Sequence, residues 1–250
     1  MERRSFLTGA LVSITPRAFA ADVLPLKVLS SMAAQGALGE IAPMIHQAGV
    51  VMNVTFSATV PIAERLQKGE TADLVLIGKG AIDRLVKDGK VAAVVDLFVS
   101  EEGLAVADTA PTPVIRNVDD FKTIVEAAPS IAITARGVSG LRLQKLLRDL
   151  GLVEVLEKRT VLVEEGFTAT RLLKGEVSMA VQQLSELKAA GAKNFVRFPD
   201  EMQVPTTFSV AIMKGSTRIS AAETAVRIMS SAEAAPAWAR SLVAPIAKVK

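Results

Sequence analysis

The chain has 250 residues, of which 50% are hydrophobic and 22% are charged, so it can bury a core as one large domain or as two smaller ones. Its net charge is +3 and only 4% of its residues are aromatic, which argues against a nucleic acid as its partner. Because cysteine is absent and His46 is the only histidine, the composition excludes disulfides and thiol nucleophiles and disfavours hydrolase triads. We expect no metal ion and no cofactor.

The N-terminus has the pattern of an export signal over residues 1–20. Arg3 and Arg4 precede an apolar run, residues 6–14, that is too short to span a bilayer. A small-x-small pattern ends at Ala20, so we expect cleavage directly after this residue and a mature protein in the periplasm. The opening RRSFL resembles a twin-arginine signal, and a general secretory signal is the alternative interpretation.

The first unit after this signal is a strand that leads into a helix through two serines. Residues 27–29 form an apolar strand, and apolar positions within residues 37–45 recur at helical spacing. Ser30 and Ser31 stand between the two. A helix N-terminus with small hydroxyl side chains offers unpaired N–H groups to an anion. An ordinary helix cap without a ligand is the alternative interpretation.

The same strand-to-helix turn recurs along the chain. The spacing predicts a strand over residues 51–56, then Thr59 and a helix that ends at Gly69. Residues 72–77 form a continuous apolar run, which is typical of a strand buried on both faces, and a third helix ends at Gly89. This alternation predicts an α/β protein with largely parallel sheets.

A change of pattern near residue 100 predicts the start of a second lobe. Two extended runs adjoin there, and strands over residues 130–134, 160–163 and 177–181 then alternate with helices. Candidate ligand contacts follow these three strands: Arg136, Ser139, Gly140, Phe167 and Gln182.

An extended run over residues 206–213 and two C-terminal helices predict a return to the first lobe. We expect residues 21–100 and 206–250 to form lobe 1 and residues 101–205 to form lobe 2, joined by two crossing strands. Ligands of open parallel sheets bind outside the carboxyl ends of the strands, where both lobes place neutral donors. We therefore expect a monomer whose cleft closes on a small oxyanion or carboxylate.

Two short segments of the chain repeat one another. RLQKGE at residues 65–70 and RLLKGE at residues 171–176 each end a predicted helix at a glycine and precede a strand. The repeat favours two lobes of similar construction, and a chance match of common helix-ending residues is the alternative.

Four longer segments follow one another in a characteristic order. They are SSMAAQGALGEIAP from Ser30, TFSATVPIAERLQKGE from Thr55, ADLVLIG from Ala72 and IMSSAEAAPAWARSLVAP from Ile228. Together with the export signal, they resemble the molybdate-binding type of periplasmic solute-binding protein. The resemblance implies a type 2 periplasmic-binding fold of two α/β lobes and the delivery of a small oxyanion to the permease of an ABC importer. It implies ligand contacts near Ser31 or Ala33, Thr59, Ser139 with Gly140, the Phe167 amide and Gln182.

The sequence differs from that family at several of these positions. The family's opening serine aligns with Ala33, residues 138–140 replace a proline-alanine-glycine segment, and Gln182 stands where the family has a tyrosine. The ligand is therefore left open between oxyanions and carboxylates. Arg136 favours a carboxylate through a bidentate pair if it points inward, and a solvated loop arginine is the alternative.

An enzyme on the same scaffold is the second hypothesis, because a branch similar to these proteins includes periplasmic aconitate isomerases. Moving a proton next to a carboxylate requires a general base close to the substrate carbon. Glu164 and Glu165, which precede a predicted helix, are candidates for that base. Surface charges that favour the helix N-terminus are the alternative interpretation of this pair.

Overall fold

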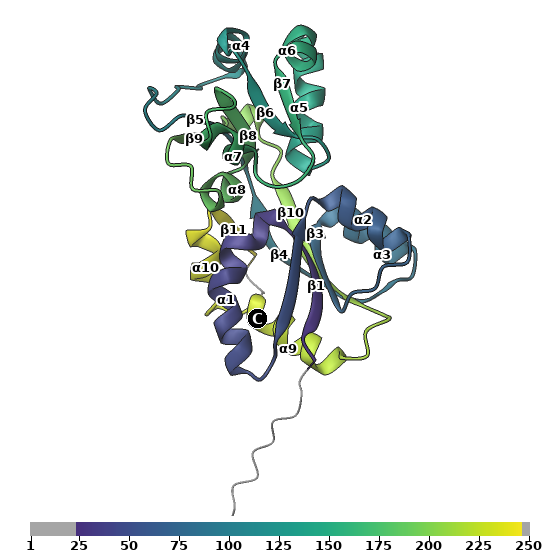
Figure 1. Ribbon diagram of the computed structural model, residues 1–250. Coiled ribbons are helices and arrows are strands. Elements are labelled where there is room, and N and C mark those ends of the chain that lie inside the picture. The colour runs from purple at the N-terminus through teal and green to yellow at the C-terminus, as the bar shows by residue number, and fades with distance from the viewer. Residues whose placement is uncertain (1–23, 247–250) are drawn as a thin grey trace, which may run out of the picture.

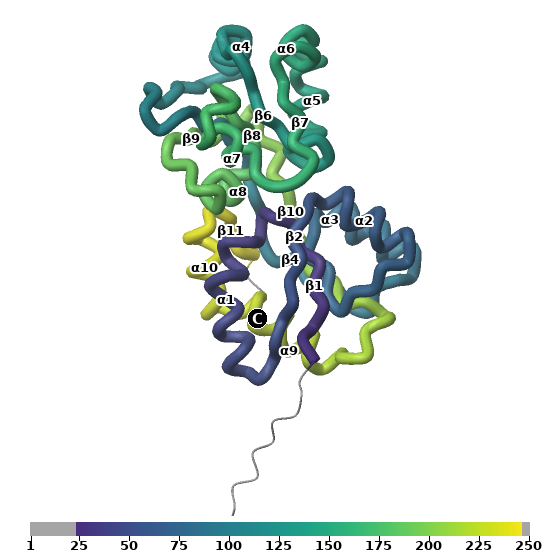
Figure 2. The backbone as a smooth tube through the Cα atoms, viewed as in Figure 1, coloured from purple at the N-terminus to yellow at the C-terminus, as the bar shows by residue number. Residues whose placement is uncertain are grey.

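The computed structural model describes residues 24–246, which form two lobes, one above the other in Figure 1. The expected export signal, residues 1–20, and its cleavage point after Ala20 lie outside the described residues. Figure 2 traces the chain from the lower lobe to the upper lobe and back. No helix of the described part is both long and apolar enough to cross a membrane.

Lobe 1 is built on a six-stranded sheet in the order β11-β4-β10-β3-β1-β2. Its strands are β1 (Leu26–Ser31), β2 (Met52–Ser57), β3 (Leu74–Gly78), β4 (Val91–Ser100), β10 (Thr206–Met213) and β11 (Val243–Pro245). Its helices are the 3-10 helix η1 (Met32–Ala34), α1 (Gln35–Gln47), α2 (Thr59–Gln67), α3 (Lys79–Lys87), α9 (Ile219–Met229) and α10 (Ala235–Arg240).

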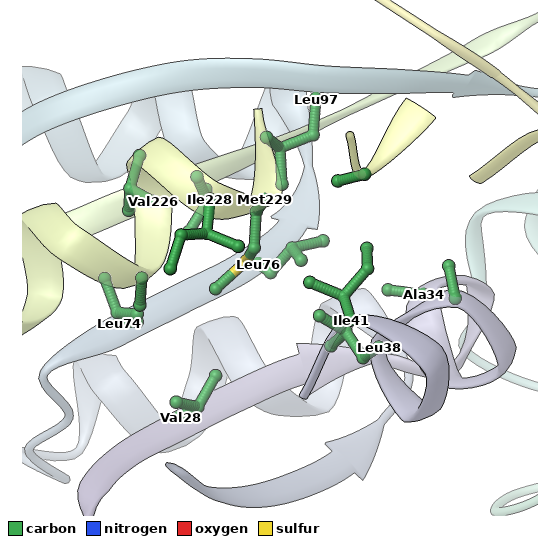
Figure 3. Close-up of a cluster of buried hydrophobic side chains, with 14 of the residues drawn as sticks. Val28, Ala34, Leu38, Ile41, Leu74, Leu76, Leu97, Val226, Ile228 and Met229 are labelled. Carbon is green, nitrogen blue, oxygen red and sulfur yellow. The ribbon is translucent and has the colours of Figure 1, made fainter. Parts of the chain in front are cut away.

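The central strands β1 and β3 are buried on both faces, because helices cover both sides of the sheet there. Val28 and Leu76 pack into a cluster that includes Ile41 of α1 and Met229 of α9 (Figure 3). Leu29, the neighbour of Val28, faces the opposite side and packs into the cluster beneath α2 and α3. Alternate residues of one strand thus enter two cores, which explains the uninterrupted apolar run in the sequence.

An aromatic stack closes the first core. The ring of Phe98 lies 5.0 Å from the ring of Phe208 and 4.7 Å from that of Trp238, measured between centroids. The indole N–H of Trp238 donates to the Met229 carbonyl at 2.8 Å, so its one polar group is satisfied. This stack packs the C-terminal helix α10 against β4 and β10, the two strands of lobe 1 that connect to lobe 2.

Lobe 2 is built on a five-stranded sheet in the order β7-β6-β8-β5-β9. Its strands are β5 (Glu102–Val106), β6 (Ile131–Thr134), β7 (Thr160–Val163), β8 (Met179–Gln183) and β9 (Phe195–Arg197). Its helices are α4 (Val118–Ala127), α5 (Val138–Asp149), α6 (Val153–Lys158), α7 (Thr168–Leu173), α8 (Leu184–Ala189) and the 3-10 helix η2 (Asp200–Met202). Clusters around Phe121 and Leu172 fill its two faces.

The α/β fold with two sheets agrees with the expectation from the sequence, but both sheets are mixed and not largely parallel as predicted. Strands linked by a helix, such as β1 with β2 and β3 or β6 with β7, pair in parallel. Strands at the crossings, such as β10 against β3 and β4 or β5 against β8, pair antiparallel. In lobe 1, for example, β4 leads toward lobe 2 and β10 returns from it. These two neighbouring strands run in opposite directions, so they pair antiparallel.

The repeated segments RLQKGE and RLLKGE have the same local structure. Arg65 binds the Glu70 carboxylate at 2.5 and 2.9 Å, and Arg171 binds that of Glu176 at 2.6 Å. The intervening Gly69 and its counterpart in lobe 2 both have positive φ, at 95° and 72°. Each segment therefore ends its helix with a left-handed glycine and a local ion pair.

The two short helices α6 and α8 were not predicted by the sequence pattern. Each has six residues, which is too few to repeat an apolar spacing. The helix α8 packs against η1 and α1 of lobe 1. The Lys188 ammonium on α8 also donates to the Arg240 carbonyl of α10 at 2.6 Å, so this helix of lobe 2 contacts lobe 1 directly.

Candidate functional site

A small cavity lies between the lobes and is lined by both. Its volume is about 10 Å³, close to the room that one water molecule needs. A larger ligand can enter only if the lobes separate or the lining side chains move. The lining residues are Ser31, Met32, Ala58, Thr59 and Phe208 from lobe 1, and Thr134, Gly137, Val138, Ser139, Gln183 and Glu186 from lobe 2.

The cavity lies where strands end and helices begin, as the sequence pattern predicts. Ser31 is the last residue of β1, Thr134 is the last of β6 and Gln183 is the last of β8. Thr59 and Ser139 belong to the first turns of α2 and α5. Carboxyl ends of strands from both sheets thus meet at one place, which is the usual position of a ligand in open α/β sheets.

Two helix N-termini at this cavity have no side-chain cap. The residues that precede α2 and α5 are Ala58 and Gly137, and neither gives the helix a side-chain hydrogen bond. By contrast, Asn117 caps α4 far from the cavity by accepting the Asp120 amide at 2.8 Å. Uncapped first-turn amides point a positive dipole end into the cavity, so both lobes favour an anion there.

The hydroxyl side chains of lobe 1 are held in place by backbone amides. The Ser31 hydroxyl accepts the Ala33 amide at 3.3 Å, and the Thr59 hydroxyl accepts the Gly78 amide at 3.3 Å. Each oxygen is used as an acceptor by the protein, which leaves its own O–H free to donate to a ligand. These two groups therefore suit an anionic ligand.

Two polar side chains of lobe 2 are buried at the cavity without partners. The Thr134 hydroxyl has no hydrogen-bond partner in the described part of the chain, and the side-chain Nε2 of Gln183 has none either. Both residues are under 5% exposed. Because an unpaired buried polar group costs about 1–3 kcal/mol, such groups point to a ligand that would pair with them.

A buried carboxyl completes the cavity wall. A carboxylate oxygen of Glu186 accepts a hydrogen bond from the backbone N–H of Gln183 at 3.4 Å. Burial raises the pKa of Glu186 to about 8; the hydrogen bond from Gln183 opposes this shift, and the charge of Glu102 adds to it. Near neutral pH this carboxyl is therefore mostly protonated and able to exchange a proton with a ligand.

A second buried carboxyl lies behind the first. Burial raises the pKa of Glu102 to about 7, although the positive charge of Arg142 lowers it. The guanidinium of Arg142 binds the Glu102 carboxylate at 2.9 Å and also donates to the Val204 carbonyl. Arg142 on α5 therefore contacts both places at which the chain crosses between the lobes.

Three of the expected ligand contacts meet at the cavity. They are Ser31 and Thr59 from lobe 1 and Ser139 from lobe 2, all buried. Gly140 stands next to Ser139 but does not line the cavity; a Cβ atom there would overlap the carbonyl oxygen of Thr134. This glycine lets α5 approach β6 closely, so it positions the cavity wall.

The other expected contacts do not line the cavity. The Ser30 hydroxyl donates to the Ser31 carbonyl at 3.1 Å, inside the protein. Gln182 is fully buried, and its side-chain oxygen accepts the Thr168 amide at 2.8 Å and the Thr168 hydroxyl at 3.0 Å. Phe167 precedes α7 and is half-buried outside the cavity. These three residues support the cavity walls from behind or from the side.

The charged candidates also lie outside the cavity. Arg136 pairs with Glu64 of α2 in the other lobe, so its guanidinium does not point at a ligand. Glu164 and Glu165, the candidates for a general base, are exposed and absent from the cavity wall. Ala33 is buried, and its backbone N–H donates a hydrogen bond to the Ser31 hydroxyl.

The sequence analysis missed Thr134, Gln183 and Glu186. Thr134 ends a predicted strand, so the strand-end rule that selected Ser31 would have selected it also, whereas Gln183 ends β8 two residues beyond the strand predicted over residues 177–181. Glu186 lies on the six-residue helix α8, for which the sequence offers no periodic signal. Within residues 24–246, no three His, Cys, Asp or Glu side chains are grouped so as to hold a metal ion.

Known proteins of similar sequence and structure agree with this architecture. An aconitate isomerase from a Pseudomonas species is 34% identical over 251 positions, which cover 96% of this chain and 95% of that protein. The periplasmic molybdate-binding protein of Azotobacter vinelandii superposes with a TM-score of 0.76 and 16% identity, covering 87% of this chain and 98% of the other. The sulfate-binding protein SubI of Mycobacterium tuberculosis H37Rv superposes with a TM-score of 0.71 and 18% identity, covering 89% and 87%.

The family model for bacterial extracellular solute-binding proteins matches residues 26–241. The match begins at the first strand and ends just after α10, so it includes both lobes and every wall of the cavity. The chain therefore belongs to the bacterial extracellular solute-binding protein family.

Proposed function

We propose that this protein is an isomerase of a small tricarboxylate, similar to aconitate isomerase, that works in the cleft of a solute-binding fold. The observation that carries the proposal is Glu186, a buried carboxyl on the cavity wall with its pKa raised to about 8. Such a carboxyl can donate a hydrogen bond to an anion when it is protonated and can accept a proton when it is ionised. An enzyme that moves protons requires one with a pKa near the working pH.

The reaction itself is a proton shift along three carbons. Aconitate has a methylene and a vinyl carbon on either side of one central carbon. Removal of a methylene proton gives an allylic carbanion whose charge is shared by the two outer carbons and their carboxylates, and return of the proton to the former vinyl carbon moves the double bond. The new double bond forms with either geometry, so the cis and trans isomers interconvert. We assign both transfers to the Glu186 carboxylate.

The remaining cavity residues have a binding role in this proposal. The hydroxyls of Ser31, Thr59 and Ser139 and the uncapped amides of α2 and α5 bind the substrate carboxylate next to the reacting carbon. These donors stabilise the negative charge that develops when the proton leaves. The unpaired side-chain Nε2 of Gln183 offers a further donor to the same substrate.

Incubation of the purified protein with cis- or trans-aconitate tests the proposal. We expect the two isomers to interconvert, and in D₂O we expect deuterium to enter the methylene position. E186Q keeps the size of the protonated carboxyl but cannot accept a proton, so its rate should fall by about 10²–10⁴-fold. E165Q, which alters an exposed glutamate outside the cavity, is the matched control and should retain the full rate. An unchanged isomer ratio with the unmodified protein would contradict the proposal.

Transport of a small anion is the second candidate function, favoured by the uncapped helix N-termini that face each other from the two lobes. In this function the protein delivers its ligand to the permease of an ABC importer. Calorimetric titration with molybdate, tungstate, sulfate and a panel of di- and tricarboxylates separates the candidates. Tight binding of an oxyanion together with no isomerisation supports transport.

We also propose that residues 1–20 direct export to the periplasm and that cleavage follows Ala20. The arginine pair and the short apolar run support this assignment. N-terminal sequencing of the protein from a periplasmic extract should start at Ala21. Replacement of Arg3 and Arg4 by lysine distinguishes the two export routes, because it blocks a twin-arginine signal and leaves a general secretory signal active.

A further inference from the structure

A wide groove adjoins the small cavity and has a positive wall. Its volume is about 620 Å³, and it shares Thr59 and Val138 with the cavity. The groove lies between α3 of lobe 1, α5 of lobe 2 and the crossing segment that leads into β10. Its charged residues are Lys79, Asp83, Arg84 and Arg142.

Arg84 is the groove cation that is not engaged by a carboxylate. Arg142 binds Glu102, and Lys79 lies 3.4 Å from both Asp83 and Asp96. Arg84 forms no ion pair with any residue of the part that the structure describes, although it lies on the same helix as Asp83. Its planar guanidinium is therefore available to bind a carboxylate in bidentate fashion.

The sizes of the two spaces show how one substrate can use both. The cavity accommodates little more than a water molecule, whereas a tricarboxylate is many times larger. With its reacting part in the cavity, such a molecule can extend past Thr59 into the groove, because the two spaces share Thr59 and Val138. Apolar side chains there, among them Val60 and Leu141, suit a short carbon skeleton.

We propose that the groove is a second carboxylate subsite, in which Arg84 binds the distal carboxylate of a substrate whose reacting end lies in the cavity. This inference rests on the proposed function and adds to it the residue that binds a carboxylate distant from the reacting carbon of the tricarboxylate. Arg84 is a specificity-determining residue in this arrangement, since it acts on binding and takes no part in the proton transfer.

The saturated tricarboxylate tricarballylate tests this subsite separately from catalysis, because it has no double bond to move. We expect the full-length protein to bind it, and R84Q to raise its Kd about tenfold through loss of one charge-assisted pair. K87Q removes a charge from the same helix outside the groove and should change Kd by less than about twofold. For aconitate, R84Q should raise KM about tenfold and leave kcat within about twofold.

The outcomes distinguish this inference from the proposed function. If tricarballylate binds, R84Q weakens binding and aconitate is not isomerised, the subsite stands and the proposed function fails. If R84Q and K87Q have equal effects on Kd, or if the unmodified protein does not bind tricarballylate, the subsite is wrong whether or not aconitate reacts. Rescue of the R84Q affinity by R84K further supports a direct contact with a carboxylate.

Discussion

Arg136 of lobe 2 forms an ion pair with Glu64 of lobe 1. Both side chains are 40% exposed, so water screens the pair. The residue expected to bind a ligand carboxylate thus binds a carboxylate of the opposite lobe. The pair contributes to holding the lobes together, and the Arg136 guanidinium is engaged by the protein itself.

This pairing predicts that R136Q and E64Q have similar, small effects on ligand affinity. A half-exposed ion pair contributes up to about 1 kcal/mol, so each variant should change the Kd for tricarballylate by less than about fivefold. Titration calorimetry measures both. If Arg136 instead contacts the ligand, R136Q alone will weaken binding by tenfold or more, and E64Q will not.

The raised pKa of Glu186 predicts the pH dependence of isomerisation. As a general base this carboxyl must be ionised, and burial places its pKa at about 8. We therefore expect kcat/KM for aconitate to rise about tenfold per pH unit below pH 8 and to level off above it. A rate that does not vary between pH 6 and 8 would exclude Glu186 as the base.

The same residue predicts how the stability of the fold varies with pH. The folded pKa of Glu186, about 8, lies above its ordinary value of 4.5, so the fold binds this proton more tightly than the unfolded chain does. The stability that the proton contributes is complete below pH 4.5 and is lost as the pH rises through 8, by up to about 1.4 kcal/mol per pH unit. Glu102, with its pKa raised to about 7, acts in the same direction.

Thermal unfolding between pH 5 and pH 8 checks this dependence. E186Q remains neutral throughout, so its Tm should fall less than that of the unmodified protein as the pH increases. E165Q alters an exposed carboxylate and serves as the control, with a pH dependence equal to that of the unmodified protein. If the Tm of all three proteins falls equally as the pH rises, Glu186 is not a buried carboxyl that ionises in this range.

The contact of α5 with β6 predicts opposite effects of alanine at two helical glycines. A Cβ atom at Gly140 would overlap the Thr134 carbonyl and hydroxyl, so G140A should destabilise the protein by about 1–3 kcal/mol or more and displace Ser139. A Cβ atom at Gly39 of α1 meets nothing within 4 Å, so G39A should stabilise by up to about 1 kcal/mol. Denaturant unfolding measures both changes in the free energy of unfolding. Equal changes for G140A and G39A would contradict the close approach of α5 to β6.

The agreement between sequence and structure is best where local pattern and burial coincide. The strand predicted over residues 206–213 has those bounds in the structure, and Ser31, Thr59 and Ser139 meet at the cavity. Their positions could be predicted because each lies where a strand or loop turns into a helix. Gln182 stays a prediction: side chains alternate along β8, so Gln183 lines the cavity, whereas the Gln182 side-chain oxygen accepts the Thr168 amide of α7.

The sequence by itself determined the α/β class, the two lobes and the neutral hydroxyl groups at the strand ends, because these follow from periodicity and from turn residues that are close in the chain. Only the tertiary structure decided that Glu186 lines the cleft, that Arg136 pairs with Glu64 and that Arg84 faces a groove. The physical reason is that the burial and charge partners of a side chain depend on residues far away in sequence. A carboxyl therefore becomes a proton carrier or an ion-pair partner only when the two lobes come together.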